Sequence, residues 1–272
     1  MKQPKLSVVT VVYNAAAQLE QTILSVAAQA GPGIEYLVID GGSQDGTVEV
    51  LRKWSPSIQR WVSEPDRGIY DAMNKGFEWS RGEWIYFLNA GDTLCEGMLA
   101  RMLDLANGSA SRPDLFCAKV AMVDPTGRPL NYTHPVSRGD TAKLLRENCI
   151  AHQATLVHRS MFERHGGFSL DYRIMGDYEY WIRLLRAGAT FRFEDLVVAE
   201  FATGGVSSRR ENYLVSQRER LGILVRHGYL SPAHAAFLRM RLALAFRAKS
   251  LIRTLVGKRL SDRISLARAQ RP

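Results

Sequence analysis

Cysteine is scarce in this sequence, and long apolar runs are missing. The three cysteines, Cys95, Cys117 and Cys149, are widely spaced and form no Cys-x-x-Cys pair. Disulfide frameworks and zinc sites are built from paired cysteines, so the sequence argues against both and predicts a reducing compartment. A membrane-spanning helix needs roughly 18 or more consecutive apolar residues, and no such run is present.

Two signatures of nucleotide-binding enzymes are also missing. There is no Gly-x-Gly-x-x-Gly motif, which argues against a dinucleotide-dependent oxidoreductase. A nucleotidyltransferase would need a glycine-rich phosphate loop directly after its first strand, and residues 13–17 contain no glycine. We also find no internal repeat and no low-complexity tract, so repeat architectures are not expected.

The first apolar stretch, residues 6–12, follows Lys2 and Lys5 and could be taken for a signal peptide. The run is short, Tyr13 and Asn14 end it, and no small-residue cleavage pattern follows. We therefore expect a buried first strand.

The chain has 272 residues, of which 46% are hydrophobic and 23% are charged. That is enough to build one large domain or two small ones, and it argues against disorder. The net charge of +9 is unevenly distributed: residues 206–272 carry fifteen Lys and Arg against three Asp and Glu, a net of +12, whereas residues 1–205 carry a net of −3. A basic tail of this kind predicts an anionic partner rather than a particular fold.

Strand-like and helix-like segments alternate through the first hundred residues. Apolar, β-branched runs predict strands at residues 6–13, 34–40, 58–63 and 84–88, and helical spacing predicts helices at residues 15–30, 46–54 and 69–81. Thr47 is expected to cap the second helix. This β-α alternation predicts an α/β fold with a mostly parallel central sheet and helices on both faces.

The later part of the chain mixes short strands, turns and helices, and ends in a helical tail. Residues 177–187 are expected to form a helix with Trp181 facing inward. From Asn212 onward the sequence is helical and basic, and Ser231 followed by Pro232 is typical of the start of a second tail helix.

Polar residues follow each predicted strand of the first half. These clusters are Tyr13-Asn14, Asp40-Gly41-Gly42, Glu64-Pro65-Asp66 and Asn89-Ala90-Gly91-Asp92. Ligands of parallel sheets bind at the carboxyl ends of the strands, so we expect all four clusters to meet on one rim. A carboxylate at Asp40 can accept from a nucleobase or ribose, and a hard cation such as Mg²⁺ or Mn²⁺ could use Asp92. Each cluster by itself is equally consistent with a turn or a helix cap.

Taken together, these segments and residues 66–76 (DRGIYDAMNKG) resemble the family 2 glycosyltransferases of the GT-A fold. The resemblance covers roughly residues 5–205, and it is closest to bacterial members that build exopolysaccharide or O-antigen repeats. It implies a nucleotide-sugar-binding half at residues 1–110, an acceptor-binding and catalytic half at residues 111–205, and a separate basic helical tail at residues 206–272.

The resemblance also implies roles for individual residues. Residues implied to bind the nucleotide-sugar are Thr10, Tyr13, Asp40, Asp66, Gly68, Asn74, Lys75, Asn89 and Gly91. Asp92 is the implied ligand of Mg²⁺ or Mn²⁺. Because Asn89 and Gly91 stand where relatives usually carry acids, we expect low affinity for the free ion.

Residues 175–181 (MGDYEYW) resemble the family segment whose Asp is the general base of inverting enzymes, with Gly176 in place of the usual acid. Asp177 is therefore the implied base, and a helix N-cap is its alternative role. His152 and Gln153 are implied to lie near the acceptor or the diphosphate, and a purely structural histidine is the alternative. Residues 201–207 are similar to a loop that closes over the nucleotide in relatives.

In the tail, a helix over residues 237–255 would place Phe237, Met240 and Leu244 on one side, with Arg241 and Arg247 on its flanks. This pattern is typical of an interfacial helix on an anionic membrane, and packing on its own domain or a partner subunit is the alternative. No groove-reading motif supports nucleic-acid binding.

The sequence thus predicts an inverting glycosyltransferase that moves a sugar from a UDP-sugar to a hydroxyl of a glycan or lipid-linked acceptor in bacterial polysaccharide biosynthesis. A cytoplasmic protein with its tail at the inner face of the plasma membrane is expected. The alternative is a nucleotide-sugar-binding module without catalysis.

Overall fold

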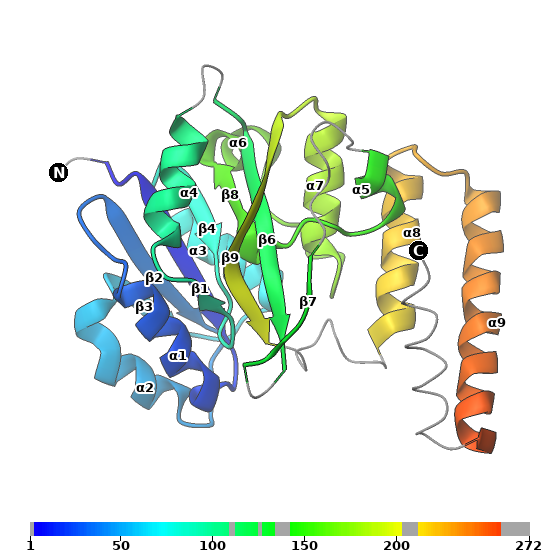
Figure 1. Ribbon diagram of the computed structural model, residues 1–272, viewed down its shortest axis with the longest axis horizontal. Helices are drawn as coiled ribbons and strands as arrows, with labels where there is room; N and C mark the ends of the chain where they lie inside the picture. Colours follow the sequence, from blue (N-terminus) through cyan, green and yellow to red (C-terminus); the bar gives the residue numbers. More distant parts are fainter. Residues whose placement is uncertain (1–2, 109–111, 125–126, 134–141, 203–211, 257–272) are drawn as a thin grey trace. The chain divides into compact units, whose positions relative to one another are not determined.

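The structure is a computed structural model that describes residues 3–108, 112–124, 127–133, 142–202 and 212–256. The chain divides into two compact units, residues 1–209 and residues 210–272. The first unit carries a mixed sheet of nine strands with helices around it, and the second is a pair of helices (Figure 1).

The first half of the larger unit alternates strands and helices. Its elements are β1 (Leu6–Val12), α1 (Ala16–Ala27), β2 (Ile34–Asp40), α2 (Thr47–Trp54), η1 (Ser55–Ser57), β3 (Arg60–Ser63), α3 (Ile69–Trp79) and β4 (Trp84–Phe87). Strands β3, β2, β1 and β4 lie in that order and pair in parallel. All seven residues of β1 are buried, so the expected buried first strand is confirmed.

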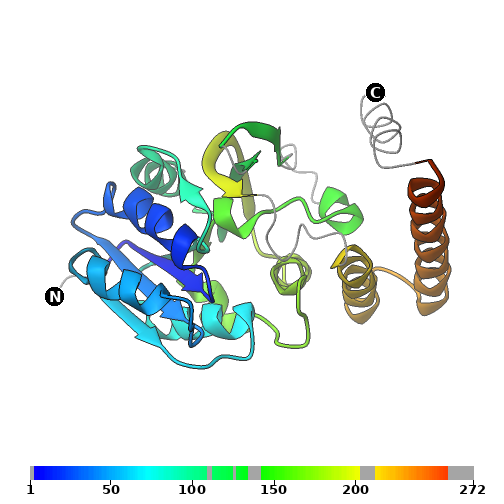
Figure 2. The same cartoon turned by 90° about the horizontal axis from the view of Figure 1, so that it is seen from below.

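The two faces of β1 explain why helices lie on both sides of this part of the sheet (Figure 2). Val8 and Val12 belong to the apolar core that also contains Leu19 and Ile23 of α1. Residues that alternate with them point to the other face. There Val9 packs so closely against Gly76 of α3 that a Cβ at Gly76 would overlap it.

The second half adds β5 (Thr93–Leu94), α4 (Met98–Asn107), β6 (Leu115–Val123), β7 (Pro129–Tyr132), α5 (Ala142–Arg146), η2 (His152–Ala154), β8 (Thr155–His158), α6 (Arg159–His165), α7 (Gly176–Arg186) and β9 (Phe191–Ala202). Strand β8 inserts between β4 and β6 and is antiparallel to both. The sheet order is β3-β2-β1-β4-β8-β6-β9-β5, with β7 beside β6. The predicted α/β class is confirmed, and the sheet is parallel up to β4 and mixed beyond it.

The expected helix cap at Thr47 and the alternative cap role of Asp177 are both wrong. The N-cap of α2 is Gly46, which has a φ of 97°, and Thr47 is the first helical residue, its N–H donating to Asp45 Oδ1 over 3.1 Å. The N-cap of α7 is Met175, so Asp177 lies inside the first turn and does not cap the helix. A cap role therefore no longer competes with a chemical role for Asp177.

In its described residues, 212–256, the smaller unit contains α8 (Tyr213–Arg226) and α9 (Pro232–Val256). The rings of Tyr213 and Phe246 stack with centroids 6.2 Å apart, which joins the two helices. His234 N–H donates to Ser231 Oγ over 3.3 Å, which confirms the expected start of the second tail helix. Within the residues described above, no helix is long and apolar enough to cross a membrane.

Candidate active site

The loops that follow β1 and β2 are tied to each other by hydrogen bonds. Asn14 has a φ of 47°, a left-handed conformation that Asn tolerates better than most residues. In this conformation its N–H donates to Ser43 Oγ over 2.7 Å, and its Oδ1 accepts from Gln44 N–H over 2.9 Å. The loop after β4 joins the same edge, because Ala90 N–H donates to Val11 O over 3.1 Å. The strand ends therefore share one rim, as the sequence predicts.

Asp40 connects the end of β2 to the end of β3. Its side chain is fully buried, and Oδ2 accepts from Ser63 Oγ over 2.5 Å and from the Ser43 N–H over 3.0 Å. Ser43 Oγ donates to the other carboxylate oxygen. Asp40 thus fixes the shape of the rim.

Three features lie together on this rim: the exposed ring of Tyr13, the backbone of Gly41, which carries no side chain, and the carboxylate of Asp66. The carboxylate of Asp66 lies so close to Gly41 that a Cβ at Gly41 would overlap it, and that Cβ would be 3.3 Å from the Tyr13 ring. Tyr13 is 65% exposed, and Asp66 Oδ1 accepts from Gly68 N–H over 2.8 Å. A planar group that donates hydrogen bonds, such as a nucleobase, matches this set of contacts.

Three other residues implied to bind the nucleotide hold the protein's own structure. Thr10 is buried, and its hydroxyl is 3.1 Å from Tyr36 Oη. Asn74 makes two hydrogen bonds with the backbone of Phe168: its Nδ2 donates to the O over 2.9 Å, and its Oδ1 accepts from the N–H over 2.8 Å. Lys75 Nζ lies 2.8 Å from Glu64 Oε1 and donates to Pro65 O over 2.9 Å, so it braces the loop that carries Asp66.

A second group of side chains gathers where η2 meets the loop after β4. His152 Nε2 is 2.8 Å from Asn89 Nδ2, and His152 Nδ1 is 3.4 Å from Asp177 Oδ2. The neighbouring Gln153 donates from Nε2 to Asp92 Oδ2 over 3.0 Å. The short helix η2 thus links Asn89 and Asp92 to Asp177, which is far away in the sequence.

Tyr70 and Gly176 complete the surroundings of Asp177. Tyr70 Oη donates to Ile174 O over 2.7 Å and lies 3.4 Å from Asp177 Oδ1, which also accepts from the Tyr178 N–H over 2.7 Å. A Cβ at Gly176 would come within 2.7 Å of the Tyr70 ring. An acid at position 176 has no room here, which gives a physical reason for the glycine.

Sequence reasoning did not assign Tyr70 to the site. Tyr86 was also missed; its hydroxyl donates to Gln153 O over 2.6 Å. Burial raises the pKa of Tyr86 well above its ordinary value, and the Asp92 carboxylate raises it further. Tyr86 therefore stays protonated and keeps the backbone of Gln153 in place.

A metal ion at this site would find few protein ligands. Among the residues that the structure describes, no group of three or more His, Cys, Asp or Glu could hold one. Gly91, next to Asp92, has no side chain, and its N–H donates to Thr22 Oγ1 over 3.0 Å. Asp92 is therefore the single acid among residues 89–92. A single carboxylate fits Mg²⁺ or Mn²⁺ only where water and substrate phosphates supply the other ligands.

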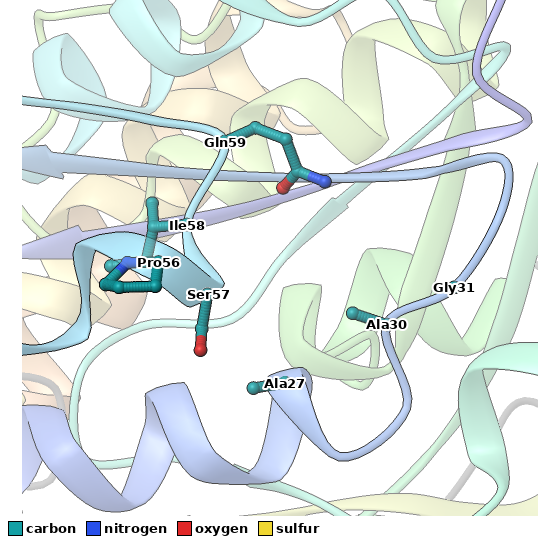
Figure 3. A pocket seen from close by; sticks show the side chains of 7 residues that line it. All are labelled: Ala27, Ala30, Gly31, Pro56, Ser57, Ile58 and Gln59. Carbon is teal, nitrogen blue, oxygen red and sulfur yellow. The ribbon is translucent and has the colours of Figure 1, made fainter.

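A hollow of about 350 Å³ lies elsewhere, between the end of α1 and η1 (Figure 3). It is lined by Ala27, Ala30, Gly31, Pro56, Ser57, Ile58 and Gln59. These residues come just before β2 and β3, at the edge opposite the carboxyl ends of the strands, and they include no charged side chain. The hollow is therefore not part of the site. The expected loop over residues 201–207 lies largely outside the described residues.

The fold is that of the GT-A glycosyltransferases. The chain is similar to S. aureus TarS 1–349 in complex with UDP-GlcNAc, with a TM-score of 0.63 and 16% identity over 95% of this chain and 77% of that one. It is also similar to the mannosyltransferase PcManGT from Pyrobaculum calidifontis in complex with GDP-Man and Mn²⁺, with a TM-score of 0.60 and 21% identity over 98% and 80% of the two chains. It spans 41% of the longer TarS chain.

The model of glycosyl transferase family 2 matches residues 7–166, and the chain belongs to this family. It is 33% identical over 216 residues to an uncharacterized glycosyltransferase of Mycobacterium tuberculosis, which covers 76% of this chain and 79% of the relative. It is 31% identical over 213 residues to a PGL/p-HBAD biosynthesis glycosyltransferase of Mycobacterium bovis, which covers 76% and 81%. The protein is therefore a glycosyltransferase enzyme.

Proposed function

We propose that the protein transfers a sugar, with inversion, from a UDP-sugar to a hydroxyl of a glycan or lipid-linked acceptor in bacterial polysaccharide biosynthesis. The observation that carries the proposal is the connection of Asp177 to Asp92 through the adjacent residues His152 and Gln153. This connection joins a candidate general base, Asp177, to a carboxylate that could bind a metal ion, Asp92. Both lie beside a rim suited to a nucleotide. TarS bound to UDP-GlcNAc supports a uridine donor, and PcManGT bound to GDP-Man makes guanosine the second choice.

In this mechanism Asp177 acts as the general base. Its carboxylate takes the proton of the acceptor hydroxyl while the hydroxyl oxygen attacks the anomeric carbon from the face opposite the leaving group. The bond from that carbon to the diphosphate oxygen breaks, and the nucleoside diphosphate leaves with the bonding electrons. Asp177 is buried on α7 and held by Tyr70 and Tyr178, which preserves its direction during the reaction.

The remaining residues bind and hold the donor. Tyr13, Gly41 and Asp66 would receive the base, while Asp40 and Lys75 keep the loops around them in place. Asp92 would hold Mg²⁺ or Mn²⁺, and such an ion, when bound, neutralises charge on a leaving diphosphate. Because Asp92 is a single carboxylate, the ion and the donor should bind together.

The proposal is tested by thermal shift with a panel of nucleotide-sugars, with and without Mn²⁺, alongside an assay for released nucleoside diphosphate. A UDP-sugar is expected to stabilise the protein most, by about 2.7 kcal/mol at a hundred times its dissociation constant, and to release UDP when an acceptor is present. Binding without release under any condition would instead identify the chain as a nucleotide-sugar-binding module.

We also infer that the tail attaches the enzyme to an anionic membrane surface, which would place it in the cytoplasm at the inner face of the plasma membrane. On α9, Phe237, Met240 and Leu244 are 50%, 55% and 57% exposed. On the opposite side of the helix, Ala235 is buried and the Phe246 ring stacks on Tyr213 of α8. Helical spacing places Arg241 and Arg247 on either flank of the exposed apolar stripe, and residues 220–261 contain no Asp or Glu.

Charge reversal of the flanking arginines, Arg241→Glu with Arg247→Glu, is expected to weaken binding to phosphatidylserine vesicles by at least about 30-fold, since each basic residue near such a surface is worth about 1 kcal/mol and the added carboxylates are repelled. Co-sedimentation with vesicles of defined phosphatidylserine content measures this. Arg52→Glu with Arg101→Glu, two exposed positions in the larger unit, is the matched control. Dimerisation without any vesicle binding would instead assign the stripe to a second copy of the chain.

A further inference from the structure

The ring of His152 lies between Asn89 and Asp177, and each ring nitrogen faces one of them. We propose that Asn89 fixes the tautomer of His152, so that the proton on Nδ1 points at Asp177 and holds its carboxylate in the orientation needed for catalysis. Asn89 and His152 are then positioning residues. The inference rests on the proposed function in one respect, because it takes Asp177 as the base.

The hydrogen-bonding capacity of each group decides where the proton of His152 lies. A neutral imidazole has one N–H and one lone pair, an amide NH₂ group can only donate, and an ionised carboxylate can only accept. Asn89 Nδ2 lies 2.8 Å from His152 Nε2, so Nε2 must be the acceptor. The proton is therefore on Nδ1, which lies 3.4 Å from Asp177 Oδ2 and donates to it.

The opposite orientation of the amide leads to a conflict. Asn89 Oδ1 would then face Nε2 and require the proton there, so that a lone pair on Nδ1 would face the Asp177 carboxylate. A neutral histidine would repel Asp177 in that arrangement. In the observed orientation Asn89 Oδ1 is buried without a hydrogen-bond partner, and the NH₂ group is the part of the amide that faces His152.

Both carboxylate oxygens of Asp177 have neighbours that hold the side chain. Its Oδ1 accepts from the Tyr178 N–H over 2.7 Å and lies 3.4 Å from Tyr70 Oη, while Oδ2 faces His152. The side chains of His152 and Asp177 are 12% and 11% exposed. One lone pair of Oδ2 is thus occupied by the histidine, which leaves the other directed to an acceptor hydroxyl. The contact of 3.4 Å is expected to shorten when substrates bind.

An aspartate at position 89 would destroy this arrangement. Its carboxylate can only accept, so it would require a proton on His152 Nε2. His152 would then either turn a lone pair toward Asp177 or carry two protons between two carboxylates. Asn89→Asp therefore keeps the shape of the side chain but moves the proton of the histidine ring from Nδ1 to Nε2.

The test combines ¹⁵N NMR of the histidine rings with steady-state kinetics on the full chain. Spectra of ¹⁵N-histidine-labelled protein at pH 8 distinguish the two tautomers, and His152→Asn assigns the signal. The wild type is expected to show the Nδ1–H tautomer, and Asn89→Asp a proton on Nε2. Loss of a hydrogen bond that orients a metal-binding histidine costs about 10- to 100-fold in activity, and we expect a loss of similar size here, in kcat, with little change in the KM of the donor.

Asn107→Asp is the matched control. Asn107 Oδ1 accepts from Trp84 Nε1 over 3.2 Å at the end of α4, away from Asp177, so neither the His152 signal nor kcat should change. A wild-type His152 with its proton on Nε2, or an Asn89→Asp variant with unchanged kcat, would overturn the proposal. If the wild type showed the Nδ1–H tautomer but transferred no sugar from any donor, the proposed function would fail and the tautomer assignment would stand.

Discussion

Asp177→Asn is expected to lower kcat for sugar transfer by about 10²- to 10⁴-fold, the range that a general base contributes. The physical reason is that an amide cannot take the proton of the acceptor hydroxyl, although it has nearly the same size and shape as the carboxylate. The carbonyl oxygen of that amide could still accept from the Tyr178 N–H, as Asp177 does over 2.7 Å, so the start of α7 should keep its shape.

Donor affinity separates this result from simple unfolding. The dissociation constant of the UDP-sugar, measured by isothermal titration, should remain close to that of the wild type, because the variant changes none of the contacts among Tyr13, Gly41 and Asp66. Asp104→Asn, an exposed position on α4, is the matched control and should leave kcat unchanged. Turnover of Asp177→Asn at the wild-type rate would remove Asp177 from the mechanism.

Asp92→Asn is expected to have the second largest effect, a loss of about 10²- to 10³-fold in kcat, which is typical when one stabilising contact to developing negative charge is removed. Asp92 is 5% exposed, one of its oxygens accepts from Gln153, and Thr22 Oγ1 donates to its backbone O over 2.7 Å. The variant should also need far more Mn²⁺ than the wild type for half-maximal activity, since it loses the negative charge and one acceptor oxygen of the carboxylate.

Chelation provides an independent measurement. EDTA should abolish turnover by the wild type, and added Mn²⁺ should restore it. Titration calorimetry should show weak binding of Mn²⁺ to the free protein and tighter binding with UDP present, because the diphosphate supplies ligands that the protein lacks. Asp195→Asn, at a position 83% exposed at the side chain, serves as the control. Equal activity with and without EDTA would show that Asp92 does not act through a metal.

Much of the rim could be predicted from the sequence because it depends on local order. Alternation of strands and helices fixes a parallel sheet, and a parallel sheet brings the ends of β1, β2 and β4 to one edge whatever the details of packing. Tyr13, Asp40 and Asp92 could therefore be placed on that edge before any coordinates were known. The start of α9 at Pro232 could also be predicted, because Ser231 and Pro232 act within one helical turn.

Side-chain direction was less predictable. Thr10 lies in β1 beside residues of the rim, but its hydroxyl meets Tyr36 in the interior. Asn74 shares a helix face with Tyr70, yet it bonds to the backbone of Phe168. A motif fixes which residues are near a site, but their partners depend on loops that approach from elsewhere in the chain.

The sequence by itself determined the α/β class, the rim of strand ends and the basic tail, because periodicity, turn residues and charge act over a few neighbouring positions. Only the tertiary structure decided that Tyr70 reaches Asp177 across 107 positions and that Asn89 reaches His152 across 63. The second of these contacts forms because β8 inserts beside β4 and carries η2 to the rim. Pairing between distant strands is set by how the whole sheet packs, and no local pattern encodes it.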